Sequence, residues 1–81
     1  MERSEIERRV KQVVSRVLRI DESEIEPHHH FVFDLGADSA QSVQLVDAFE
    51  EEFKIEMDRD AALAVKTVGE AVEFIAGYVN R

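Results

Sequence analysis

Residues 34–39, Asp-Leu-Gly-Ala-Asp-Ser, join a loop to a helix and decide how the chain around them folds. Gly36 has no Cβ, so the backbone can turn there with a positive φ at little cost. Asp38 is a preferred N-cap residue, and Gln41 stands three positions later, which is the spacing of a capping box. The pattern predicts a helix that begins at Ser39. A phosphate esterified to this serine would lie at the positive end of the helix dipole.

The residues that follow predict a helix from about Ser39 to Phe53. Its inward stripe, with apolar side chains at helical spacing, comprises Leu45, Val46, Phe49 and Phe53. Acidic side chains crowd its outer and C-terminal part, namely Asp47, Glu50, Glu51 and Glu52. Exposed carboxylates at a helix C-terminus oppose the dipole by about 0.3–1 kcal/mol each. This locally unfavourable choice favours a binding surface, and a merely solvated face is the alternative.

Two further segments combine helical periodicity with capping-box spacing. A first helix is expected from about Ser4 to Arg19, with Ser4 and Glu7 as the box. Its apolar stripe comprises Ile6, Val10, Val13, Val14, Val17 and Leu18. A last helix is expected to start at Thr67, with Glu70 three positions later. Its stripe comprises Val68, Val72, Ile75 and Val79, widened by Ala71, Phe74 and Tyr78.

A short helix and a long loop complete the expected fold. Asp58, as an N-cap, predicts a short helix from Asp58 to Ala64. Residues 20–38 form a long first loop, and its expected anchors in the core are Ile25, Phe31 and Leu35. The fold class is therefore all-α: a small four-helix bundle of three longer helices and one short helix, in a single domain over residues 1–81.

Charge and composition exclude several classes of function. The net charge is −8, but residues 1–19 carry +3 and residues 20–81 carry −11. Nucleic-acid binding needs a larger basic face and is not expected. The acidic part favours the basic surfaces of proteins, and a charge that serves solubility alone is the alternative. The chain has no cysteine, and no apolar segment approaches the roughly 20 residues of a membrane span. We expect a cytoplasmic monomer without membrane insertion.

The residues indicate neither a metal site nor catalysis. His28, His29 and His30 are adjacent, and adjacent residues rarely direct three imidazoles at one ion. A solvated, pH-responsive loop is the preferred interpretation. Ser39 has no sequence neighbour that would act as its base, and no carboxylate pair shows an acid–base spacing. We therefore expect no enzyme and no metal.

The segment from Leu35 to Ser39 resembles the phosphopantetheine attachment motif of the acyl carrier proteins. The similarity continues through residues 43–53 and 66–72, and with the amphipathic first helix it covers nearly the whole chain. The resemblance implies that a phosphopantetheinyl transferase attaches 4′-phosphopantetheine to Ser39, and that Asp38 helps this enzyme recognise the site. It also implies that acyl intermediates are held as thioesters, for fatty-acid, lipid or polyketide synthesis.

The resemblance also implies which residues meet partners and cargo. Acyl-loading and condensing enzymes with basic surfaces would contact Ala40, Val43, Asp47, Glu50, Glu51 and Glu56. The acyl chain would be sheltered by Phe31, Val46, Phe49, Ala62, Leu63 and Val65. Small residues such as Ala62 leave room that a tightly packed core would not.

The chain also departs from the pattern of the family. Where the family commonly has apolar residues at two partner positions, this chain has Ala40 and Asp47. Where acidic residues are common, it has Phe33, Gln41, Gln44, Lys54, Arg59 and Leu63. We therefore expect a specialised carrier and not a housekeeping one. An aminoacyl or peptidyl carrier, or an unmodified acidic adaptor for basic proteins, remain alternatives, and a hydrolase that uses Ser39 has almost no support.

Overall fold

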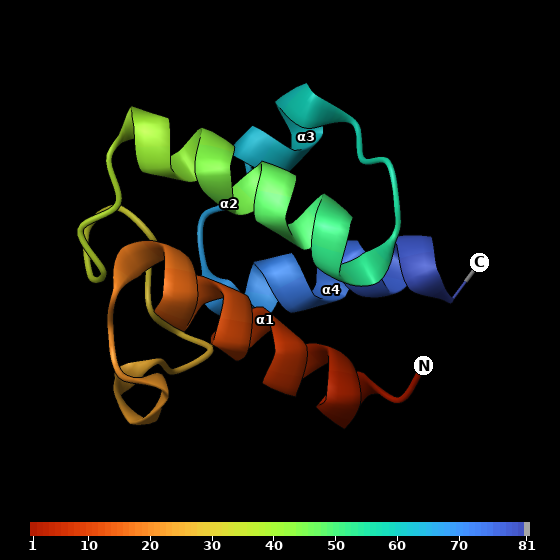
Figure 1. The fold of residues 1–81 in the computed structure, drawn as a ribbon, viewed down its shortest axis with the longest axis horizontal. Helices are drawn as coiled ribbons and strands as arrows, with labels where there is room; N and C mark the ends of the chain where they lie inside the picture. Colours follow the sequence, from red (N-terminus) through yellow and green to blue (C-terminus); the bar gives the residue numbers. More distant parts are fainter. Residues whose placement is uncertain (81) are drawn as a thin grey trace.

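The computed structural model describes residues 1–80 as a bundle of three long α-helices and one short one (Figure 1). The helices are α1 (Arg3–Leu18), α2 (Ser39–Phe53), α3 (Arg59–Leu63) and α4 (Val68–Val79), and a single 3₁₀ turn, η1, spans Glu22–Glu24. No β-strand occurs within residues 1–80; the one strand-like pairing is an isolated bridge between His30 and Thr67. The all-α bundle expected from the sequence is confirmed.

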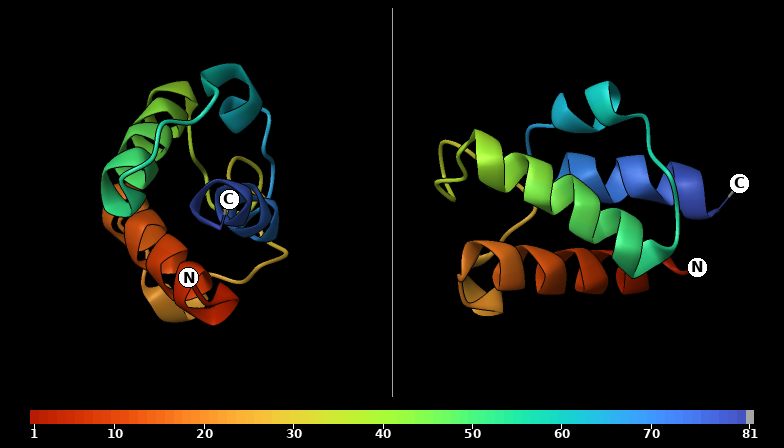
Figure 2. Two further views of the ribbon diagram at one scale, coloured as in Figure 1. Left: turned by 90° about the vertical axis from the view of Figure 1, so that its right-hand side faces the viewer. Right: turned by 45° about the horizontal axis from the view of Figure 1, so that its top comes forward.

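The core lies between α1, α2 and α4, which surround it when the bundle is viewed end-on (Figure 2). The buried apolar residues are Ile6, Val10, Val13, Val14, Ile25, Phe31, Ala37, Leu45, Val46, Phe49, Phe53, Met57, Val68, Ala71, Val72 and Ile75. All four residues of the predicted inward stripe of α2 are among them. No polar or charged residue of the described chain is buried, so apolar contact holds the three long helices together.

Local capping fixes where α2 and α4 begin. The Gln41 backbone N–H donates to Asp38 Oδ1 at 2.7 Å, and the Asp38 N–H donates to Gln41 Oε1 at 3.2 Å. Thr67 and Glu70 form the same reciprocal pair, with both N–H···O distances at 3.1 Å. Asp58 Oδ1 accepts from the Ala61 N–H at the start of α3. These three predicted helix starts are confirmed. They could be predicted from the sequence because a cap depends on residues only three positions apart.

The predicted capping box of the first helix is wrong. The helix begins at Arg3, its N-cap is Glu2, and no side chain caps it. The Ile6 N–H already donates to the Glu2 carbonyl at 3.0 Å, so Ser4 lies inside the helix. The N-terminal ammonium of Met1 donates to Asn80 Oδ1 at 2.6 Å, which holds this end of α1 against the end of α4. The start of α1 therefore has a contact with the end of α4 and no side-chain cap.

Two helices end in a conformation that the sequence does not signal. Arg19 after α1 and Lys54 after α2 adopt left-handed backbone angles, with φ of 59° and 57°. Glycine is the usual residue there, because a Cβ disfavours this conformation. The N–H groups of Ile20 and Ile55 donate back to carbonyls of the preceding helices, which satisfies the helix ends.

The long first loop is tied to the start of α4. The Phe31 N–H donates to the Lys66 carbonyl at 3.0 Å, and the Val68 N–H donates to the His29 carbonyl at 3.1 Å. The Gly69 N–H donates to the Pro27 carbonyl at 2.8 Å, and a Cβ on Gly69 would lie 3.1 Å from that carbonyl oxygen, so the close approach favours glycine.

The predicted core contacts of this loop are found. Ile25 and Phe31 are buried, and Leu35 is half-buried and packs against the core. Ala37, which the sequence reading did not single out, is 2% exposed. The segment that precedes Ser39 is thus anchored in the core by Phe31 at one end and by Ala37 at the other.

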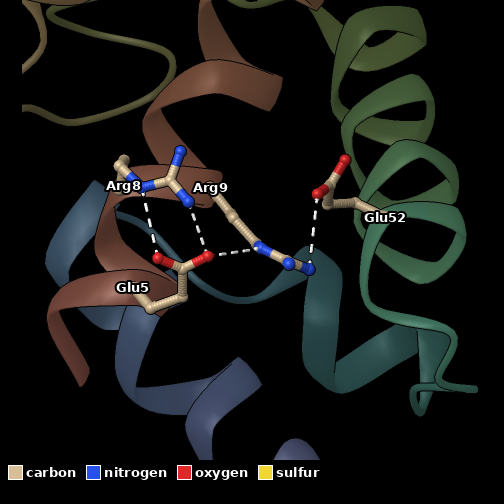
Figure 3. A network of polar contacts seen from close by, with 4 residues as sticks. All are labelled: Glu5, Arg8, Arg9 and Glu52. Atoms are coloured by element: carbon tan, nitrogen blue, oxygen red, sulfur yellow. Dashed lines mark hydrogen bonds and ion pairs between the residues drawn. The ribbon is translucent and has the colours of Figure 1, made fainter. Parts of the chain in front are cut away.

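A polar network on the surface joins α1 to α2 (Figure 3). Glu5 accepts from Arg8 and from Arg9 on its own helix, and Arg9 reaches across to Glu52 Oε2 at 3.7 Å. The hydrogen bonds from Arg8 and Arg9 lower the pKa of the Glu5 carboxyl. Since these groups are partly exposed, the network adds little to stability.

Candidate functional site

Ser39 is the first residue of α2, and its side chain is exposed. Its hydroxyl makes no hydrogen bond with any group in residues 1–80, and the backbone N–H groups of Ser39 and Ala40 donate to no acceptor there. Gly36 has a φ of 75°, as expected, and the turn leads the chain from the core into α2. The site therefore combines an accessible hydroxyl with unpaired N–H groups at the positive end of a helix, which suits a phosphate.

Asp38 lies beside that hydroxyl and caps the helix. Its Oδ1 is engaged by the Gln41 N–H, while the Asp38 backbone carbonyl accepts from the Ser42 hydroxyl at 3.0 Å. The carboxylate is exposed, so it can meet a partner while it caps the helix. The positive end of the α2 dipole would stabilise both the carboxylate of Asp38 and a phosphate attached to Ser39.

An apolar cavity of about 40 Å³ lies behind the site, between α2, α3 and α4. All six residues that were predicted to shelter the acyl chain border this one cavity: Phe31, Val46, Phe49, Ala62, Leu63 and Val65. The prediction did not include the other six lining residues, which are Ser42, Leu45, Met57, Ala71, Phe74 and Ile75. The signal for Ser42 was available, because it lies one helical turn after Ser39.

The outer face of α2 differs from the expectation in two respects. Asp47 Oδ1 accepts from Arg59 Nη2 of α3 at 2.7 Å, and this hydrogen bond raises the pKa of the Arg59 guanidinium. Glu50 is half-buried, and its Oε2 accepts from the Met57 N–H at 2.8 Å. Glu50 therefore holds the loop between α2 and α3, and Asp47 is a partnered charge. The other four predicted partner residues, Ala40, Val43, Glu51 and Glu56, are exposed.

The three histidines do not form a metal cluster. No group of three or more His, Cys, Asp or Glu side chains within residues 1–80 is placed to hold a metal ion. His29 Nδ1 instead accepts from the Glu26 N–H at 3.0 Å, and His30 Nδ1 accepts from two backbone N–H groups of the loop. Two of the histidines thus serve as side-chain caps of the loop backbone.

Comparisons with known proteins find a family model and a solved structure that match this chain. The family model of the phosphopantetheine attachment site matches residues 8–75, which is most of the chain. The chain belongs to the acyl carrier protein family. A solved structure from Mycobacterium tuberculosis, a protein provisionally described as an acyl carrier protein, superposes with a TM-score of 0.82 at 33% identity. The match covers 89% of this chain and 96% of that chain.

Family membership settles several properties of this chain. Acyl carrier proteins are carriers and not catalysts, and their cofactor is 4′-phosphopantetheine. They interact with a phosphopantetheinyl transferase and with enzymes that handle acyl groups. The exposed Ser39 hydroxyl and the open N–H groups beside it fit the phosphate of this cofactor. No helix in residues 1–80 has the length and apolar character that a bilayer span requires.

Proposed function

We propose that this carrier holds acyl intermediates as thioesters on 4′-phosphopantetheine attached to Ser39. The observation that carries the proposal is the exposed, unbonded Ser39 hydroxyl at the capped start of α2, inside the matched segment. In the loading reaction, Ser39 Oγ forms a bond to the β-phosphorus of coenzyme A and displaces adenosine 3′,5′-bisphosphate, while the hydroxyl proton passes to a base of the transferase. Asp38 would offer that enzyme a carboxylate beside the reacting hydroxyl.

The bound arm ends in a thiol, which would carry the cargo as a thioester. The apolar cavity supports an acyl cargo, because a polar aminoacyl group would lose its hydration there without a charged partner. A volume of about 40 Å³ admits roughly three water-sized groups. We propose that the first few carbons of a chain enter the cavity as described, and that a longer chain requires α3 to move outward.

Helix α3 is suited to such a movement. It has five residues, none of them buried, and Ala62 and Leu63 form part of the cavity wall. Exposed contacts hold it at its first turn: the Asp47–Arg59 ion pair, and a hydrogen bond from the Asp58 N–H to the Tyr78 hydroxyl at 3.0 Å. Exposed contacts of this kind add little to stability. The free energy gained when an acyl chain buries its apolar surface would offset the loss of these contacts.

Loading is tested by intact mass. Incubation with coenzyme A and a promiscuous phosphopantetheinyl transferase should add the mass of one phosphopantetheine to the natural chain. Ser39→Ala should abolish the gain and keep the helical spectrum, because an exposed side chain at the first helical position contributes little to stability. Ser42→Ala is the matched control, since it removes a hydroxyl from the same helix, and it should load. Loading of Ser39→Ala would refute the assignment.

Cargo sheltering is tested by NMR on the loaded protein. Attachment of a butyryl group should shift the methyl signals of Val46, Leu63 and Val65 relative to the unacylated form. Val10 in α1 does not line the cavity and is the internal control. Acylated and unacylated proteins with identical cavity signals would exclude internal sheltering, while leaving attachment at Ser39 intact.

We also propose a specialised carrier in fatty-acid, lipid or polyketide synthesis, whose partner enzymes have basic surfaces. Glu51 and Glu56 keep exposed carboxylates on the expected partner surface, and Val43 is 38% exposed. Asp47 forms an ion pair with Arg59. A partner enzyme would therefore contact an ion pair at the position where the family commonly has an apolar side chain. This substitution disfavours one set of partners while it suits another.

A further inference from the structure

Phe33 is the most exposed large apolar side chain among the described residues, with 84% of its surface open to solvent. It lies six positions before Ser39, in the loop that extends past the start of α2 (Figure 1). Its ring contacts the His30 ring, with centroids 4.4 Å apart. Phenylalanine is ordinarily a core residue. An exposed phenylalanine ring beside the functional site therefore suggests a binding role.

The loop that carries Phe33 is rigidly built. Every backbone N–H group from residue 30 to residue 38 has an acceptor. His30 is the centre of this arrangement: its carbonyl accepts from Asp34 and Leu35, and its Nδ1 accepts from Val32 and Phe33 at 3.1 and 3.2 Å. The His30 N–H in turn donates to Asp34 Oδ2 at 2.7 Å. Phe33 is therefore presented by an ordered turn, and a preorganised side chain loses little conformational freedom when it binds.

The charges around this turn indicate the chemistry of the partner. Residues 20–53 contain ten acidic side chains and no lysine or arginine, and Lys66, whose carbonyl accepts from the Phe31 N–H, is a basic residue next to the turn. The nearest acidic neighbours of Phe33 in the sequence are Asp34 and Asp38, and both are exposed. An exposed aromatic side chain in an acidic surface is complementary to an apolar pocket bordered by lysine or arginine.

We infer that Phe33 is the apolar anchor by which this carrier docks on the phosphopantetheinyl transferase that loads Ser39, in a pocket bordered by basic side chains. The inference rests on the proposed attachment at Ser39. The loading enzyme must bring coenzyme A to the Ser39 hydroxyl itself, so its surface has to cover the start of α2 and the adjoining turn. Enzymes that act on the cargo reach it through the flexible arm, so contact with this turn is not required of them as it is of the loading enzyme.

The test measures loading kinetics with coenzyme A and a promiscuous phosphopantetheinyl transferase. Phe33→Ala should lower kcat/KM by about tenfold or more through a higher KM, as is typical when an aromatic anchor is truncated. Phe33→Tyr keeps the ring and should load nearly as the natural chain does. Gln12→Ala, an exposed neutral change on α1, is the matched control and should load normally. All three variants should keep the natural melting temperature, because none of these side chains is buried.

Each other outcome has a distinct meaning. Unchanged kcat/KM for Phe33→Ala overturns the inference, and so does a lowered melting temperature, which would give Phe33 a structural role. If the natural chain sediments as a dimer and Phe33→Ala as a monomer, the occupant is a second copy and the transferase assignment is wrong. A natural chain that gains no phosphopantetheine contradicts the proposed function itself, whereas normal loading with no effect of Phe33 contradicts only the anchor.

Discussion

Replacement of Asp38 separates the two roles that its carboxylate has at the start of α2. Asp38→Ala removes the acceptor of the Gln41 N–H, which the structure places 2.7 Å from Oδ1. Loss of an N-cap side chain costs about 1 kcal/mol, within a range of roughly 0.5–2. For a domain of this size, 1 kcal/mol lowers the melting temperature by about 4–8 °C. We expect a decrease of that magnitude for Asp38→Ala.

Asp38→Asn is the matched variant, because asparagine caps a helix about as well as aspartate does. It keeps the hydrogen bond to Gln41 and loses only the charge, whose interaction with the helix dipole contributes about 0.3–1 kcal/mol when exposed. We therefore expect Asp38→Asn to lose less stability than Asp38→Ala. Loading by the transferase should fall in both variants, because the carboxylate next to Ser39 is absent from each.

Thermal denaturation followed by circular dichroism, combined with the rate of loading, tests this reasoning. Equal destabilisation of the two variants would show that charge, and not the cap, accounts for the effect of Asp38. An Asp38→Ala variant as stable as the natural protein would refute the capping argument altogether. An Asp38→Asn variant that loads at the natural rate would refute the role of the carboxylate in recognition.

Two other predictions follow from ionised contacts. Hydrogen bonds from the N–H groups of Lys66 and Thr67 lower the pKa of Glu70 below its ordinary value of 4.5. Its stabilising effect is therefore present above that pH and is lost as the pH falls through the lower value in the folded state. The stability difference between the natural protein and Glu70→Gln should shrink in acid, as urea denaturation from neutral pH downward can measure; a constant difference would contradict the assignment. Separately, Ala40→Leu combined with Asp47→Met should improve elongation by housekeeping fatty-acid enzymes while barely changing the melting temperature, because the ion pair of Asp47 with Arg59 is exposed. No gain in a reconstituted elongation assay would mean that these two residues do not set partner choice.

Much of the fold could be predicted because its signals are local. A helix cap is made by residues three positions apart, so the starts of α2 and α4 could be placed from Asp38 with Gln41 and from Thr67 with Glu70. The inward stripe of α2 repeats with the period of the helix, and all of it is buried. Ser39 could be placed at the first helical position for the same local reason.

Only the tertiary structure decided the contacts between elements. Asp47 meets Arg59 because α3 folds back across α2, and Glu50 caps the Met57 N–H because the intervening loop returns to it. The first helix lacks its predicted box because it begins at Arg3, which places Ser4 inside the helix, and Met1 contacts Asn80 at the far end of the chain. Such contacts depend on how the helices are placed relative to one another, and that placement follows from the packing of the whole core.

The site divides in the same way. Residue type and spacing placed the serine and its cap at the start of a helix, and the resemblance to the family indicated six of the twelve residues that border the cavity. The structure decided that the cavity is only about 40 Å³ in volume, and that Phe33 is held in water by a turn built on His30. Side-chain exposure and cavity volume depend on where the chain's other segments lie, and no local pattern contains those positions.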